Sequence, residues 1–163
     1  MKKIIIGVIG RGNNATGKDT KNAFILGKLI AEDNYVLLTG GRNVGVMDAA
    51  SKGAKQKNGL TIGIIPSSDK KDSSDYVDIA IITGMGSARN NINVLSSDVL
   101  IAVGIGPGTA SEIALALKVK KEIILLDPDK ETELFFKKIG KSLVYTAKDP
   151  KGAVKIAKKI LGD

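Results

Sequence analysis

Residues 98–117, DVLIAVGIGPGTASEIALAL, contain the residue types that bind an anion. Gly104, Gly106 and Gly108 interrupt an apolar run, so the backbone can turn sharply and approach a ligand. Thr109 adds a hydroxyl, and apolar residues at helical spacing follow it, which places free backbone N–H groups at the positive end of a helix. We therefore predict that this loop binds a phosphate group.

Glu112 lies in the first turn of the same predicted helix. A carboxylate there stabilises the helix dipole by about 0.3–1 kcal/mol, but it repels a phosphate group if both point the same way. Two interpretations stay open: a purely structural helix-end carboxylate, or a group that faces the ribose of a bound nucleotide.

Only three of the 25 basic residues are arginines, and all three follow strand-like runs within glycine-rich loops. They are Arg11, Arg42 and Arg89. The guanidinium group forks onto phosphate or carboxylate oxygens, which favours a role in ligand binding. For Arg11 and Arg42, contact with a ligand and a salt bridge between subunits both remain open.

Four glycine-rich loops, at residues 10–18, 40–45, 84–91 and 104–109, follow predicted strands. The carboxyl ends of parallel strands meet at one edge of a sheet, so we expect these loops to form one crevice for a phosphorylated ligand. The alternative for each loop alone is that a tight turn requires glycine. The predicted ligand-binding residues are Gly10, Arg11, Gly40, Gly41, Arg42, Gly84, Met85, Asn90, Gly104, Gly106, Gly108 and Thr109.

The elements that must position these residues alternate along the chain. Short runs rich in Ile and Val predict strands at residues 4–9, 35–38, 60–65, 77–82, 99–103 and 123–126. Amphipathic segments predict helices at residues 14–32 and 45–57, from residue 110 onward, and at residues 150–161. The pattern predicts one α/β domain over residues 1–163. It is a Rossmann-like, doubly wound, mainly parallel sheet of about six to seven strands with helices on both faces.

Residues 12–19, GNNATGKD, resemble a P-loop, except that Asp19 stands where that motif carries the Ser or Thr that holds magnesium. We therefore favour a loop that enters the first helix, with Thr16 or Asp19 as its cap. For Asp98 we favour a structural role at the entry of a strand, beside Ser96 and Ser97. The polar residues 66–75 predict either a mobile loop that closes over the site or an ordinary surface loop.

Composition limits the chemistry. The sequence has no Cys and no His, which excludes disulfides, thiol chemistry and Ser/His/Asp triads, and we expect no metal site. The net charge is +8, but the lysines are spread along the chain, so a solvated surface is favoured over nucleic-acid binding. No apolar run is long enough to span a membrane, so we expect a cytoplasmic protein without membrane association.

Longer segments carry a family resemblance. They are IGVIG at residues 6–10, LLTGGRNVGVMDAASKGA at 37–54, TIGIIP at 61–66 and TGMGSARNNINVLSSDVLIAVGIGPGTASEIALALK at 83–118. The chain resembles the superfamily of the Lonely Guy (lysine-decarboxylase-like) phosphoribohydrolases, the molybdenum-cofactor carrier proteins and the DNA-processing Rossmann proteins. The order of the TGMG, ARN, SSD and GTxSEI segments is most similar to the carrier branch.

The resemblance implies a homo-oligomer, dimer or tetramer, that binds a nucleoside monophosphate or a molybdopterin-type compound and requires no cofactor of its own. Carrier-type function is favoured. The alternative is a phosphoribohydrolase that cleaves the N-glycosidic bond of a nucleoside 5′-monophosphate, because Gly108, Thr109, Glu112 and Arg89 match that family's signature. In that case the resemblance makes Arg89 and Glu112 the catalytic candidates: Glu112 would stabilise an oxocarbenium-like transition state, while Arg89 neutralises the phosphate. Ile105 and Asn90 depart from it: Ile105 places a Cβ where the backbone is expected to approach phosphate. DNA binding is a remote third alternative.

Overall fold

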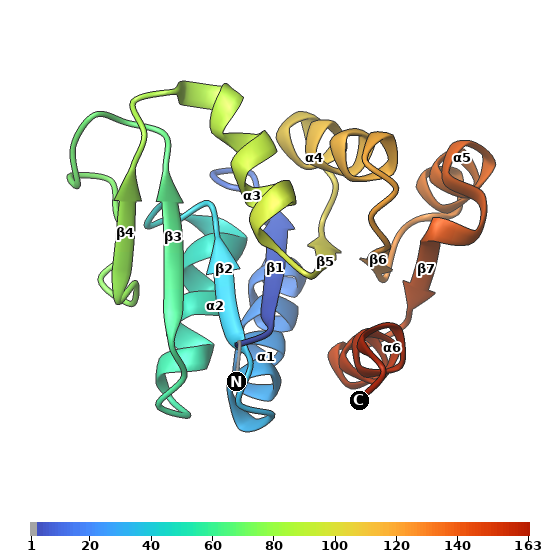
Figure 1. The fold of residues 1–163 in the computed structure, drawn as a ribbon, viewed down its shortest axis with the longest axis horizontal. Coiled ribbons are helices and arrows are strands. Elements are labelled where there is room, and N and C mark those ends of the chain that lie inside the picture. Colours follow the sequence, from blue (N-terminus) through green and yellow to red (C-terminus); the bar gives the residue numbers. More distant parts are fainter. Residues whose placement is uncertain (1–2) are drawn as a thin grey trace.

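The centre of the molecule is a seven-stranded parallel sheet (Figure 1). The computed structural model describes residues 3–163, so residues 1 and 2 of the predicted domain lie outside the described residues. The strands are β1 (Ile5–Gly10), β2 (Val36–Thr39), β3 (Thr61–Ile65), β4 (Ile79–Ile82), β5 (Val99–Val103), β6 (Ile123–Leu126) and β7 (Val144–Ala147). Their order is β4-β3-β2-β1-β5-β6-β7, which confirms the doubly wound arrangement and places the reversal between β1 and β5.

Helices cover both faces of the sheet. They are α1 (Gly17–Glu32), α2 (Gly45–Lys55), α3 (Asn90–Ser96), α4 (Pro107–Lys118), α5 (Lys130–Gly140) and α6 (Pro150–Leu161), with two 3-10 turns, η1 (Gly86–Arg89) and η2 (Lys141–Leu143). Helix α1 begins at Gly17 rather than at residue 14, because Thr16 caps it. Helix α4 begins earlier than residue 110, since Gly106 takes the N-cap position and Pro107 the first turn.

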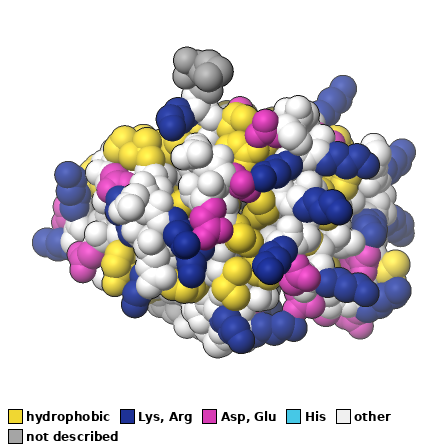
Figure 2. Space-filling view, turned by 90° about the horizontal axis from the view of Figure 1, so that it is seen from below, with side chains coloured by type: hydrophobic (Ala, Val, Ile, Leu, Met, Phe, Trp, Pro, Cys, Tyr) yellow, Lys and Arg dark blue, Asp and Glu magenta, His cyan; other side chains and the backbone are white. Residues whose placement is uncertain are grey.

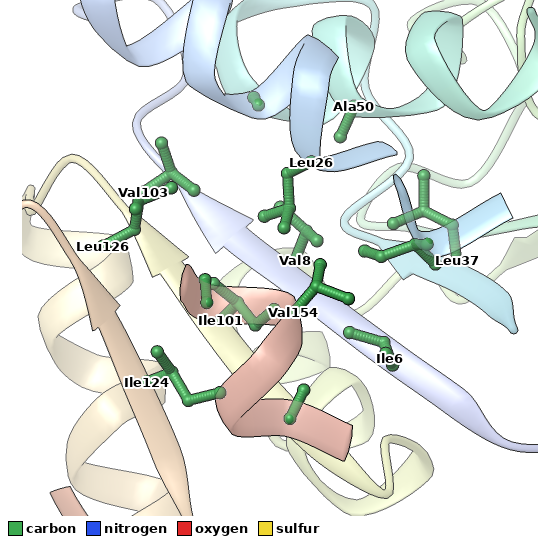
Figure 3. Packing of buried hydrophobic residues seen from close by; sticks show 14 of the residues in the cluster. Ile6, Val8, Leu26, Leu37, Ala50, Ile101, Val103, Ile124, Leu126 and Val154 are labelled. Atoms are coloured by element: carbon green, nitrogen blue, oxygen red, sulfur yellow. The ribbon is translucent and has the colours of Figure 1, made fainter. Parts of the chain in front are cut away.

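Alternate side chains of β1, β5, β6 and β7 enter two separate cores. Ile6, Val8 and Ile101 pack with α1, α2 and α6 on one face (Figure 3), and Leu100 packs with α3, α4 and α5 on the other. This follows from the two-residue period of a strand, and burial on both faces explains why the strand sequences are continuous runs of Ile, Val and Leu. The two helical layers hold the carboxyl ends of the strands in one rigid edge.

Helices α1 and α2 approach each other through glycines. A Cβ at Gly27 of α1 would lie 2.0 Å from the carbonyl oxygen of Ala50 in α2, and a Cβ at Gly53 of α2 would lie 2.0 Å from that of Phe24. We expect Gly27→Ala to lower the free energy of unfolding by about 1–3 kcal/mol, because the helices must separate. Denaturant titration measures the effect. Gly17→Ala is the matched control, since a Cβ there meets nothing within 4 Å. Equal stability of both variants would contradict the close packing.

Candidate functional site

A cavity of about 320 Å³ lies beyond the carboxyl end of β1, beside the point where the strand order reverses. Its walls come from the loops after β1, β2 and β3, from η1 and α3, and from the first turns of α4. A smaller cavity of about 160 Å³ adjoins it, and both are lined by Gly10, Gly12, Gly108 and Thr109. The predicted crevice is therefore present at the expected edge of the sheet.

The N-terminus of α4 forms the wall that the two cavities share. Gly106 is the N-cap residue, and because it is a glycine it provides no capping side chain for the helix end. The first N–H groups of α4 have no intrahelical partner, and the helix dipole makes this end positive. Asn90 donates a hydrogen bond of 3.0 Å to the Ser111 hydroxyl, which connects α3 to the first turn. This end of α4 can hold a phosphate group.

Glu112 points its carboxylate to the larger cavity from one turn further along α4. It is 5% exposed, and its Oε1 accepts a hydrogen bond of 2.7 Å from the Asn93 side-chain amide on α3. Burial raises the pKa of Glu112 to about 7, while the bond from Asn93 and the charge of Arg89 lower it. Glu112 therefore exchanges a proton near neutral pH.

Arg89 brings a buried cation to the same cavity. Its side chain ends 4.0 Å from Glu112 Oε1, donates from Nη2 to the carbonyl oxygen of Gly40 at 3.4 Å, and also bonds to Asn90 Oδ1. Burial lowers the pKa of Arg89. The negative charge of Glu112 raises this pKa, and the positive charge of Arg42 lowers it. Arg89 is only 8% exposed. Within residues 3–163, its buried Nε has no hydrogen-bond partner. A buried guanidinium with a donor to spare fits an anionic ligand.

Arg11 is held between the loops after β1 and β5. Its Nε donates to the carbonyl oxygen of Ile105 at 3.1 Å, and its Nη1 lies 3.3 Å from Asp19 Oδ2. Asp19 also accepts from the backbone N–H of Thr16, while Thr16 caps Asp19 in return, so the two form a capping box. Gly104 has a φ of +65°, and its missing Cβ leaves the space that the Asp19 carboxylate occupies. The P-loop interpretation fails here, because this carboxylate is committed to the loop.

Residues 66–75 are tied to the loop after β2. The backbone N–H of Asn43 donates to Asp72, that of Ser74 donates to Gly41, and Arg42 pairs with Ser73 in an antiparallel bridge. The Ser74 hydroxyl also donates to Asp48 in the first turn of α2 at 2.7 Å. Pro66 and Arg42 both line the larger cavity, so this pair of loops forms part of its wall.

The larger cavity is lined by most of the predicted residues: Gly10, Gly40, Arg42, Arg89, Asn90, Gly108, Thr109 and Glu112. The smaller cavity adds Arg11 and Gly106, whereas Gly41, Gly84, Met85 and Gly104 line neither cavity. Ile105 differs from the expectation, because its side chain packs against the core under α3 and α4 rather than on the phosphate site. Asp98 has the structural role, since its Oδ2 accepts from the backbone N–H of Ile5 at the start of β1.

Sequence reasoning missed Asn93, Met47 and Pro66, which also line the larger cavity. The available signal for Asn93 was its spacing of four residues after Arg89, which places both on one helical face. Within residues 3–163, no helix is both long and apolar enough to cross a membrane, and no cluster of three acidic residues could hold a metal ion.

Known proteins share this architecture. The model of the SLOG cluster4 family matches residues 3–154. The solved structure of the molybdenum cofactor binding protein from Rippkaea orientalis is 56% identical, covers 99% of each chain and has a TM-score of 0.97. The Moco carrier protein of Chlamydomonas reinhardtii is 51% identical over 99% of each chain, with a TM-score of 0.93. A protein of Archaeoglobus fulgidus is 51% identical over 129 residues, which are 78% of this chain and 83% of that protein.

Proposed function

The chain belongs to the SLOG cluster4 family, and we propose from its likeness to molybdenum-cofactor carriers that it binds a phosphorylated pterin-type ligand and releases it unchanged. One observation carries the proposal: a solved molybdenum cofactor binding protein and a solved Moco carrier protein each share more than half of this chain's residues over 99% of its length. The comparisons do not favour the phosphoribohydrolase alternative.

The crevice fits the two parts of such a ligand. The phosphate group would accept hydrogen bonds from the N–H groups of Gly108 and Thr109, and Arg42 and Arg89 would offset its charge. The pterin ring would lie in the larger cavity, beside Glu112 and Met47. A volume of about 320 Å³ is at the lower end of the range for pockets that hold small organic ligands, about 300–1,000 Å³.

The proposal is tested by loading the protein with molybdenum cofactor released from a donor enzyme. After gel filtration, we expect the pterin, measured by its fluorescence after oxidation, to elute with the protein together with molybdenum. We expect Lys52→Met to retain the pterin as the wild type does, because Lys52 is a cation of α2 that lines neither cavity. The absence of pterin from the protein fraction would overturn the proposal.

A second assay separates the carrier from an enzyme. The protein is incubated with adenosine and guanosine monophosphates, and free base is measured by chromatography. We expect none above the level that a Glu112→Gln variant shows. Base release that depends on Glu112 would overturn the statement that the ligand leaves unchanged.

Homo-oligomer formation, as a dimer or tetramer, is part of the same proposal. Ile79 and Ile81 of β4 are 46% and 44% exposed, and they pair with Ile62 and Ile64 on the α3 face of the sheet. On that face α3 lies over β1, while no helix of the described residues lies over β4 (Figure 1). Exposed apolar strand surface of this kind supports an interface between copies.

We expect Ile81→Lys to shift the protein to a smaller mass in solution, because a charge in an apolar interface costs more than the contact gains. Light scattering coupled to gel filtration measures the mass. Val119→Lys is the control, since Val119 is an exposed apolar residue at the C-cap of α4, a different element from β4. A wild-type protein that is monomeric at micromolar concentration would contradict the proposal.

Basic side chains do not form one continuous patch on the face drawn in Figure 2. Lys and Arg alternate there with Asp and Glu, although the basic groups are more frequent toward the side of α6. On the face drawn, this mixture supports a solvated surface rather than a track for a nucleic-acid backbone.

A further inference from the structure

The smaller cavity is too small to be a separate ligand site. Its volume of about 160 Å³ is below the range of about 300–1,000 Å³ that small-molecule pockets occupy. It shares Gly10, Gly12, Gly108 and Thr109 with the larger cavity, so the two are parts of one crevice. The smaller cavity therefore has a role only for a ligand that also occupies the larger one.

The N-terminus of α4 lies between the two cavities, because Gly108 and Thr109 line both. A ligand whose phosphate is its last group would fill the larger cavity and stop at this helix end. A ligand whose phosphate lies in its middle would continue past Gly106 into the smaller cavity. Gly106 and Gly108 leave this passage open, since a Cβ at Gly106 would meet only the Arg11 side chain, at 3.6 Å, and one at Gly108 nothing within 4 Å.

The walls of the smaller cavity carry groups suited to a second phosphate and a polar ring. Arg11 uses Nε and Nη1 on Ile105 and Asp19, so the remaining N–H donors of its guanidinium group are available. Asn13 and Asn14 line the opposite side, and both are exposed, so their amides can donate and accept hydrogen bonds. The larger cavity contributes the buried Arg89 with its unpartnered Nε.

We propose that the crevice accepts a dinucleotide form of its ligand, in which a pyrophosphate crosses the N-terminus of α4 and the second nucleoside enters the cavity of Arg11, Asn13 and Asn14. This proposal rests on the proposed function and deepens it. The first phosphate occupies the site shared by both forms, and the second phosphate contacts Arg11.

Calorimetric titration with guanosine monophosphate and with diguanosine 5′,5′-diphosphate tests the proposal. Guanine is a suitable probe because it carries the same 2-amino-4-oxopyrimidine edge as a pterin. We expect the wild type to bind the dinucleotide about tenfold more tightly than the mononucleotide, because charge-assisted bonds to a second phosphate are added.

Asn13→Trp and Asn14→Trp fill the smaller cavity from its exposed wall, and neither residue lines the larger cavity. We expect each variant to remove the preference for the dinucleotide and to leave mononucleotide binding within about twofold. Gly17→Trp is the matched control, because Gly17 lines neither cavity and has open space around its Cβ position.

Equal affinities of the wild type for both nucleotides would overturn the dinucleotide proposal and leave the phosphate site intact. A preference that survives in both Asn13→Trp and Asn14→Trp would also overturn it, because the second nucleoside would then lie elsewhere. If the wild type binds neither nucleotide, the phosphate site of the proposed function is overturned as well. The three results are therefore distinguishable.

Discussion

Arg89→Met is expected to weaken the binding of guanosine monophosphate about a hundredfold at pH 6, because charge-assisted hydrogen bonds contribute about 1.5–3 kcal/mol. Arg89 lines the larger cavity, is almost fully buried and has a spare donor at Nε. Loss of the guanidinium group removes a cation that no other side chain of η1 or α3 replaces. The affinity is measured by calorimetric titration.

The same substitution is expected to leave the free energy of unfolding without ligand within about 1 kcal/mol of the wild type at pH 6. Arg89 loses its bonds to Asn90 and Gly40, but the cost of burying its charge disappears too. Glu112, with a pKa of about 7, is largely protonated at pH 6 and is not left as an unpaired charge. Unchanged affinity in Arg89→Met would contradict the site, and Lys52→Met again serves as the control that removes one distant positive charge.

Glu112→Gln is expected to remove a pH dependence of stability. The pKa of Glu112 is about 7 in the folded protein, against 4.5 for an unperturbed glutamate. Because the folded state holds this proton more tightly, the free energy of unfolding falls as the pH rises from 4.5 to 7. The loss is complete above the folded-state pKa and amounts to about 3 kcal/mol at 1.36 kcal/mol per pKa unit.

Gln resembles a protonated glutamate in size and charge, so Glu112→Gln avoids this loss. We expect the variant to match the wild type at pH 5 and to exceed its free energy of unfolding at pH 8 by about 1–3 kcal/mol. Denaturant titrations at the two pH values measure the difference. Glu131→Gln is the control, since Glu131 is an exposed glutamate in the first turn of α5. An equal difference at both pH values would show that Glu112 stays ionised throughout.

The central strands could be predicted closely, because burial on both faces makes them continuous apolar runs. The range predicted for β5 agrees with its observed range, and so does that for β6. Helix α5 and strand β7 were not among the predicted ranges. In α5, Leu134 and Phe135 are exposed and Phe136 is buried, so its apolar residues do not mark one face. Strand β7 has only four residues, and two of them, Tyr145 and the polar Thr146, are only partly buried.

The loops of the site could be predicted from their composition, but their contacts could not. Arg11 and Arg42 resemble each other in the sequence, since both follow a strand and a glycine. In the structure Arg11 forms an ion pair with Asp19 at the smaller cavity. Arg42 instead lines the larger cavity and forms an antiparallel bridge with Ser73. These differences depend on residues that are close in space and distant in sequence.

By itself, the sequence determined the parallel α/β sheet and the edge at which Gly108, Thr109, Arg89 and Glu112 meet. Those features follow from periodicity, glycine placement and the rule that the carboxyl ends of parallel strands share one edge. Only the tertiary structure decided that Ile105 turns into the core and that Asn93 holds Glu112. It also decided that the N-terminus of α4 divides the crevice into two cavities. The reason is physical: burial, pKa shifts and cavity walls arise from the packing of separate elements, which no local pattern encodes.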